Sequence, residues 1–551
     1  MTDTIQPRAL VRWLGGESGH RSFFGGTHSK TRVVLLALFI GSGMVLTPLW
    51  GWPGLVIGLI GTVVTLVVTA RTYRGSIIDR RRRRKRWATR IKLGTDAFVP
   101  YETGAWDQAQ QTLTDARGRK AKWEAKRELA AIRSNPDGAD GMGWLSAGRR
   151  SPGIAWHAPM GEQQYLSVAF AVDGQMRGIE STSVMNRAAE GWGSFMAARA
   201  VPSVLVSGVQ TLTRVLPADT ALQEFWVLNS LDPTVPKEAL ESYAEVLRIT
   251  GDGAMVQRHF IIVKWPVTDA FRDAASKYGE GRDGWRALME REIESARRGL
   301  VDARMGAVQP LSARQTAAVM LHQQNPSRPI DYVSDVVPTK FGITSHDEFS
   351  AHVVDGMNAV PTPAVPVEWW HRTAMISAES LSTAPRSQLW VLDLLVGMRT
   401  PIVRSISFHI DLVPATEAKA AAKRDITRDM ADEIAKQEKG VIDLDGSATL
   451  TAAKRRGQDL APGSHHHGAM WVGYVTISAP TRDELASASR ELEETCSTGL
   501  GVERLDWQDS YQSSASGTTW PIGRGLATGT KSFSAKIYDR LAGKSDKEAI
   551  S

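Results

Sequence analysis

Two uncharged apolar segments stand out near the start of the chain. The first, Val33–Trp50, has no charged residue over 18 positions, and the second, Leu55–Tyr73, meets its first charge at Arg71. The hydrocarbon core of a bilayer, roughly 30 Å thick, requires about 20 apolar residues per helix, and about 17 are tolerated. The connector between them contains Pro53, which interrupts a helix, and two tryptophans, which favour the membrane interface. The pattern predicts a transmembrane hairpin over residues 33–73.

Basic residues flank both outer ends of this hairpin, and none lies between its two segments. Arg8, Arg12, Arg21, Lys30 and Arg32 precede the first segment. After the second comes an uninterrupted basic run, consisting of Arg80, Arg81, Arg82, Arg83, Arg84, Lys85 and Arg86. Because positive charge marks the cytoplasmic side of a span, we expect a protein of the cell membrane with two spans and both termini in the cytoplasm.

Small residues recur along the second apolar segment. Gly54 and Gly58 are four residues apart, as are Gly61 and Thr65. This spacing allows two helices to approach closely in a membrane. We therefore predict that these four residues form a helix-packing face, directed toward the first span or toward a second copy in a homo-oligomer.

The rest of the chain alternates between strand-like and helix-like segments in two similar series. The first series has expected strands at 165–172, 203–215 and 255–267, with helices at 182–200 and 236–249. The second has strands at 368–375, 401–413 and 471–478, helices at 388–396 and 481–498, and a closing segment at 502–507. We expect an α+β fold whose cytoplasmic body consists of two ferredoxin-like α/β halves produced by internal duplication.

These elements divide the chain into seven segments. The expected divisions are a cytoplasmic N-terminal segment (1–32), the hairpin (33–73), a basic collar with a helical linker (74–159), a first α+β domain with a helical extension (160–324), a connector (325–366), a second α+β domain (367–526) and a flexible tail (527–551).

Charge is distributed unevenly over these segments. The whole chain of 551 residues has a formal net charge of +7, but residues 1–32 contribute +3 and residues 71–92 contribute +10. Residues 93–551 therefore carry −6. A DNA-binding domain usually carries its own basic cluster, whereas here the cluster adjoins a predicted span, where anionic headgroups attract it. We expect the lipid bilayer to be the partner of the basic run, and the acidic body disfavours direct contact with nucleic acid.

Candidate chemistry is sparse along the sequence. The single cysteine, Cys496, falls on the apolar face of the helix expected at 481–498, so we interpret it as a core residue. The segment nearest to a phosphate-binding loop, Gly543-Lys544-Ser545, has Tyr538 where the first glycine is required. The histidine tract at 465–467 follows Pro-Gly-Ser, and we interpret it as a solvated loop. We predict no catalytic, cofactor-binding or metal-binding residue, and hence no enzyme.

Several short segments resemble one family of proteins. They are Trp156-His157, the run Glu190-Gly191-Trp192-Gly193-Ser194-Phe195, the run from Val472 to Pro480, the run from Asp509 to Ser514, and the run from Trp520 to Leu526. With the two-span N-terminus, these segments resemble an actinobacterial family of membrane proteins found alongside conjugation-type, type IV secretion-like ATPases. The second half also resembles the non-ATPase N-terminal region of conjugation ATPases.

The resemblance implies a non-enzymatic scaffold of a DNA-transfer or secretion apparatus, anchored in the inner membrane and docking a cytoplasmic ATPase with other secretion-system subunits. Two alternatives stay open. One is an EccE-like component of a type VII secretion membrane complex, which also combines two N-terminal spans with a cytoplasmic body. The other is a membrane-tethered DNA-binding protein.

Overall fold

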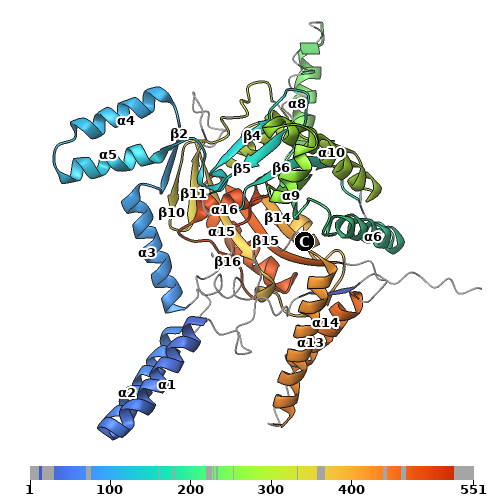
Figure 1. Ribbon diagram of the computed structural model, residues 1–551. Helices are drawn as coiled ribbons and strands as arrows, with labels where there is room; N and C mark the ends of the chain where they lie inside the picture. Colours follow the sequence, from blue (N-terminus) through green and yellow to red (C-terminus); the bar gives the residue numbers. More distant parts are fainter. Residues whose placement is uncertain are drawn as a thin grey trace, which may run out of the picture.

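The computed structural model has a mixed α/β fold built around one large sheet, from which several helical hairpins project (Figure 1). It describes residues 11–14, 30–69, 76–159, 162–175, 178, 180–218, 226–227, 229–230, 232, 234–251, 253–331, 333–356, 367–438, 444–460 and 467–526. The predicted tail at 527–551 lies outside the described residues, as does most of the N-terminal segment 1–32.

The main sheet has 14 strands, and its path runs β3-β2-β10-β11-β12-β15-β14-β7-β8-β6-β5-β4, with β16 paired to β12 and β9 paired to β6. What we call the first half consists of β6 (Tyr165–Val172), α6 (Thr182–Arg199), β7 (Gly208–Pro217), β8 (Met255–Pro266), α10 (Gly281–Asp302) and β9 (Val308–Pro310). The second half consists of β12 (Glu368–Ile376), α12 (Leu392–Val396), β14 (Val403–Val413), β15 (Gly468–Ala479), α15 (Arg482–Thr498) and β16 (Asp506–Trp507).

The two halves have the same strand order. In the first it is β9-β6-β8-β7, and in the second it is β16-β12-β15-β14. The halves meet edge to edge through β7 and β14, which pair antiparallel from Gly208 opposite Asp411 to Val215 opposite Arg404. Because backbone hydrogen bonds cross this junction, the two halves share a single sheet.

One face of the sheet is apolar and packs against helices. In the first half, Phe170 and Trp265 pack against Phe195 of α6 and Met289 of α10. In the second half, strands β12 and β15 pack against Leu394 of α12 and against Leu485, Leu492 and Cys496 of α15. Alternation along each strand places these side chains on one face and their neighbours on the other.

The opposite face is covered by the chain itself. Helix α11 (Ala313–Gln324) lies over the first half, where Val319 packs against Leu212 and Ile262. Residues 508–526, here called the C-terminal cover, include α16 (Gln512–Ser516) and the 3-10 turn η4 (Gly517–Thr519). Through most of their length they are buried. The cover bonds to β7, β12, β14 and β15, so it lies across the junction of the halves.

The segments predicted as a linker and a connector differ from expectation, because both contribute strands to the sheet. Between 74 and 159 lie β2 (Ala97–Pro100), β3 (Ile132–Arg133), β4 (Met142–Ser146) and β5 (Ile154–His157). Between 325 and 366 lie β10 (Ser345–Glu348) and β11 (Ala351–Asp355). These strands span only two to five residues each, so alternation alone gave no strand signal there.

Helices outside the halves emerge from loops between strands (Figure 1). The hairpin of α4 (Thr103–Asp115) and α5 (Arg119–Ala131) connects β2 to β3. Helix α8 (Lys237–Gly251) follows β7, and α9 (Asp269–Ser276) follows β8. The pair α13 (Ala415–Glu438) and α14 (Leu444–Asp459) connects β14 to β15. Helix α8 and the pair α13–α14 thus occupy the same connection in the two halves.

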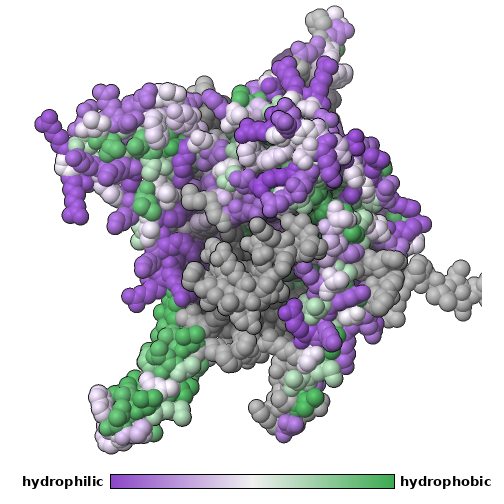
Figure 2. Space-filling model, in the orientation of Figure 1, coloured by the Kyte–Doolittle hydropathy of each residue, from purple (hydrophilic) through white to green (hydrophobic). Residues whose placement is uncertain are grey.

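The N-terminal part forms two packed apolar helices, α1 (Lys30–Trp50) and α2 (Trp52–Thr69), followed by the basic helix α3 (Ile77–Leu93). Figure 2 shows α1 and α2 as a hydrophobic arm and α3 as the hydrophilic segment between this arm and the body. A separate two-stranded sheet joins β1 (Arg12–Leu14), which precedes α1, to β13 (Ala384–Arg386) of the body.

Candidate functional site

The predicted helix-packing residues lie at the contact between α1 and α2. A Cβ atom on Gly54 would lie 2.5 Å from the backbone of Leu46, and one on Gly58 would lie 2.6 Å from the Cα of Gly43. A Cβ on Gly61 would overlap the ring of Phe39. Thr65 is buried, and its hydroxyl donates to the Gly61 carbonyl at 2.8 Å. These residues of α2 therefore pack against α1 of the same chain.

Only one of the two predicted spans meets the length and composition expected of a membrane helix. Among the described residues that helix is α2, Trp52–Thr69, whereas the apolar part of α1, Val34–Trp50, is one residue shorter. In the sequence, the uncharged part of α1 begins directly after Arg32, at Val33.

The basic run is the N-terminal part of α3, a helix with a defined beginning and end. The Ser76 hydroxyl accepts from the Asp79 backbone N–H at 3.1 Å, and the Asp79 carboxylate accepts from the Ser76 N–H at 3.2 Å. This reciprocal pair is a capping box. The helix ends at Gly94, whose φ of +72° suits glycine, and a Cβ there would lie 2.7 Å from Arg127.

The basic residues of α3 divide between two faces. Arg83 donates to Asp506 at 3.0 Å, and the Arg86 guanidinium lies 5.9 Å from the centre of the Tyr511 ring. Arg86 and Arg83 lie four and seven positions before Arg90, a spacing that places all three residues on the face of α3 directed at the body. The residues exposed on the other side are Arg80, Arg81, Arg84 and Lys85.

Arg90 is buried and joins α3 to the body through a network of hydrogen bonds. Its guanidinium donates to Asp347 of β10 at 2.5 Å, to Asp137 at 3.0 Å and to the Ser513 hydroxyl of the C-terminal cover at 3.1 Å. Asp347 also pairs with His352 at 2.8 Å. Burial alone would raise the pKa of Asp347, but the hydrogen bond and charge of His352 and the charge of Arg90 lower it below its ordinary value.

Sequence reasoning did not find this network. Its members come from segments predicted as a linker, a connector and a domain end, so no local pattern links them. The sequence offered two separate signals. Arg83, Arg86 and Arg90 are spaced to share one face of a helix, and Asp506 and Asp509 form an acidic pair near the end of the body.

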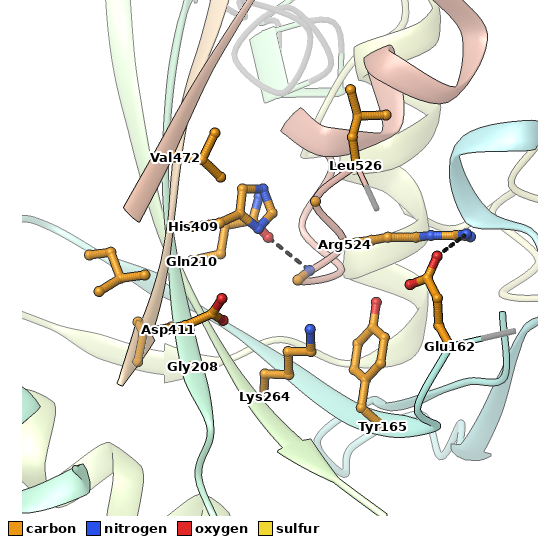
Figure 3. A pocket seen from close by; sticks show the side chains of 14 residues that line it. Glu162, Tyr165, Gly208, Gln210, Lys264, His409, Asp411, Val472, Arg524 and Leu526 are labelled. Carbon is orange, nitrogen blue, oxygen red and sulfur yellow. Dashed lines mark hydrogen bonds and ion pairs between the residues drawn. The ribbon is translucent and has the colours of Figure 1, made fainter. Parts of the chain in front are cut away.

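A cavity of about 200 Å³ lies at the junction of the two halves (Figure 3). Its walls come from β6 and β8 of the first half, from β7 and β14 at the junction, and from the C-terminal cover. The side chains in Figure 3 that carry its polar chemistry are Glu162, Tyr165, Gln210, Lys264, His409, Asp411 and Arg524.

Hydrogen bonds fix several walls of this cavity. Gln210 donates to the Trp520 carbonyl at 2.9 Å and accepts from the Gly523 N–H at 2.8 Å. His409 Nε2 lies 2.8 Å from the Thr518 carbonyl oxygen. Burial lowers the pKa of His409 to about 4, so the imidazole is neutral at neutral pH. The walls of the cavity are thus held in place by the cover.

The remaining sequence predictions about chemistry have the following outcomes. Cys496 is fully buried against the sheet, and burial raises the pKa of its thiol to about 12. Residues 465 and 466 of the histidine tract lie outside the described residues, while His467 accepts from the Ala415 N–H at 3.2 Å. Within the described ranges no group of three or more metal-ligating side chains comes together.

Comparison with known proteins does not assign the chain to a family. No protein-family model matches this chain, and the comparison with curated proteins finds no match.

Proposed function

We propose that α1 and α2 both cross the cell membrane and hold the body on its cytoplasmic side. The observation that carries this proposal is the pairing of β1 with β13. Strand β1 precedes the hairpin and β13 follows it, so the two must lie on the same side of any membrane that the chain crosses. A single span through α2 would separate them, whereas two spans allow the pairing. The ion pair between Arg12 and Asp459, at 3.6 Å, is also consistent with this arrangement.

The charge on α3 favours the cytoplasmic side. Seven residues separate this helix from the end of α2, and Arg80, Arg81, Arg84 and Lys85 are exposed on it. Lysine and arginine near the end of a span are retained in the cytoplasm. They also attract anionic headgroups, at about 1 kcal/mol per residue near the surface.

We further infer that each half is a ferredoxin-like unit and that the body arose by duplication. The strand orders β9-β6-β8-β7 and β16-β12-β15-β14 agree with the βαββαβ arrangement of that unit. The helical insertions in the same connection of both halves, α8 and α13–α14, support the same interpretation.

For the protein as a whole we propose a non-enzymatic scaffold in an actinobacterial conjugation or type IV secretion-like DNA-transfer apparatus, docking a cytoplasmic ATPase. The support is the membrane anchor, the duplicated body and the resemblance of the segments around Trp192, Tyr474 and Tyr511. The C-terminal cover contains one of these segments and is buried in the body, which fits a structural role for it.

Labelling of introduced cysteines tests the topology. Cysteine replaces Trp52, which is 77% exposed at the start of α2, or the exposed Glu124 of α5. The native Cys496 is buried, so we expect it not to react. We expect a membrane-impermeant maleimide to label Trp52→Cys in intact cells and Glu124→Cys only after permeabilisation. Labelling of Glu124→Cys in intact cells would contradict the orientation.

Purification of the tagged full chain from its native host in mild detergent, after cross-linking, tests the partner. We expect a conjugation-type ATPase among the recovered proteins, and the untagged chain is the control. Recovery of type VII secretion subunits in its place would favour the EccE-like alternative. Recovery of neither would contradict both secretion assignments without affecting the topology.

A further inference from the structure

The cavity at the junction of the two halves contains the side chain of a lysine, Lys264. Lys264 projects from β8 into the cavity, as Figure 3 shows, and its Nζ lies 4.4 Å from the centre of the Tyr165 ring. In the described part of the chain no carboxylate oxygen lies within ion-pair distance of this ammonium group, and no hydrogen bond to it is formed. Burial lowers the pKa of Lys264, and the more distant charges of Asp411 and Glu162 offset this effect only in part.

Carboxylates lie on the exposed side of the same cavity. Asp411 is on β14 of the other half, and its side chain is exposed while pointing into the cavity. Glu162 is also exposed, but it pairs with Arg524 at 3.8 Å. Arg524 donates to Asp140 as well, so its charge is already compensated. The two groups left for a ligand are therefore an ammonium group on the inner wall and a carboxylate at the mouth.

The other walls are neutral. Val472 and Leu526 contribute apolar side chains, and the phenol of Tyr165 donates to the Ile522 carbonyl at 3.3 Å. His409 is neutral, as argued above. An anion without a cationic group would meet the charge of Asp411, and a cation without an anionic group would meet that of Lys264. Only a ligand that carries both charges has a favourable partner at each end.

We propose that this cavity binds a small zwitterion, namely an α-amino acid with a short apolar side chain. Its carboxylate accepts from Lys264 Nζ, its ammonium group donates to Asp411, and its side chain packs against Val472 and Leu526. Because Lys264 and Asp411 belong to different halves, the bound ligand bridges the junction. This inference is independent of the proposed membrane and secretion role.

Isothermal titration calorimetry on the full chain in detergent tests the proposal with three matched probes. L-valine has both charges, isovalerate lacks the ammonium group, and isobutylamine lacks the carboxylate. We expect L-valine to bind at least about ten-fold more tightly than either analogue, because each analogue leaves one charged group of the cavity without a partner. Equal binding of isovalerate and L-valine, or binding of none of the three, would overturn the proposal.

Variants locate the site. Lys264→Met and Asp411→Asn should each weaken L-valine binding by about ten-fold or more. Lys277→Met, which removes an exposed lysine of the same half, should leave the affinity unchanged. L-valine should also raise the thermal midpoint of the wild-type chain and not that of Lys264→Met, since a ligand stabilises only the fold that binds it. Unchanged L-valine affinity in Lys264→Met, with its fold intact, would refute the assigned site.

Discussion

The two halves share a strand order but are covered by different chemistry. Over the first half, Leu212, Phe260 and Ile262 meet the apolar residues Leu311, Val319 and Ile330. Over the second half, the hydroxyl of Thr373 bonds to that of Thr476 at 2.8 Å, and Thr476 bonds to Thr519 of the C-terminal cover at 2.9 Å. The same face of the sheet is thus covered mainly by apolar packing over the first half and mainly by hydrogen bonds over the second, although Arg214 of β7 also bonds to His322 of α11 at 2.7 Å.

The two kinds of contact differ in how strictly they fix the position of the segment that covers the sheet. Apolar burial stabilises in proportion to area and is not directional, so the contact of Val319 with Leu212 and Ile262 does not by itself fix the position of α11. A buried hydroxyl network is favourable only when each member finds its partner, because an unpaired buried polar group costs free energy. The C-terminal cover is therefore held in one register, and that register also fixes the walls of the cavity through Gln210 and His409.

Breaking the buried charge network at the edge of the polar cover should have the largest effect. Arg90→Met removes the guanidinium that joins Asp347, Asp137 and Ser513. Because a buried charge then loses its partner, we expect a loss of about 3–5 kcal/mol in the free energy of unfolding. Guanidinium unfolding of the full chain in detergent measures it.

Arg80→Met is the matched control, since Arg80 is exposed on the same helix, and it should change stability by less than about 0.5 kcal/mol. The pH dependence gives a second check. The pKa of Asp347 is lowered in the fold, so its stabilising effect is complete above its ordinary value of 3.8 and is lost as the pH falls below that value. The difference between wild type and Arg90→Met should narrow in that acidic range, and equal losses for the two arginine variants would contradict the network's role.

Creating a cavity beneath the apolar cover should have the next largest effect. Leu212 is 1% exposed, and Leu212→Ala should cost about 2–5 kcal/mol through lost burial and the space left behind. Leu212→Met conserves volume and should cost less than about 1.5 kcal/mol. Hydrogen–deuterium exchange should show faster exchange in α11 than in α16 for Leu212→Ala. Faster exchange confined to α16 would contradict the prediction, because the substitution would then act on the C-terminal cover and not on α11.

The apolar face of the sheet was largely predictable from sequence, and the polar face was not. Alternation in β6, β8, β12 and β15 and the capping threonine of α15 produce local patterns, so these elements were predicted close to their observed positions. Ser405, Ser407 and Thr476 have the composition of a solvated face, and contacts with distant parts of the chain bury them: Arg214 and Gln210 bond to the two serines, and Thr519 of the C-terminal cover bonds to Thr476.

The candidate site shows the same limit. The small residues of α2 were recognised from their spacing, and their partner α1 is near in the chain. The basic run was recognised because its charged residues are consecutive. Lys264 and Asp411 are 147 positions apart and reach one cavity only because β7 and β14 join the halves. Nothing in either local sequence indicates that pairing.

Removing one hydrogen-bond acceptor, the side chain of Gln512, from the C-terminal cover should have the smallest effect on stability. This change tests directly whether hydrogen bonds hold the cover in place. Gln512 is fully buried, and its Oε1 accepts from the Thr373 backbone N–H at 2.8 Å, while its Nε2 has no partner among the described residues. Gln512→Ala leaves the Thr373 N–H unpaired, which costs about 1–3 kcal/mol. It also removes the unpaired Nε2, so we expect a loss near the lower limit. Exchange at the Thr373 amide and in α16 should accelerate, whereas Gln110→Ala on the exposed side of α4 should change neither. Unchanged exchange in Gln512→Ala would show that packing, and not hydrogen bonding, holds the cover over the second half.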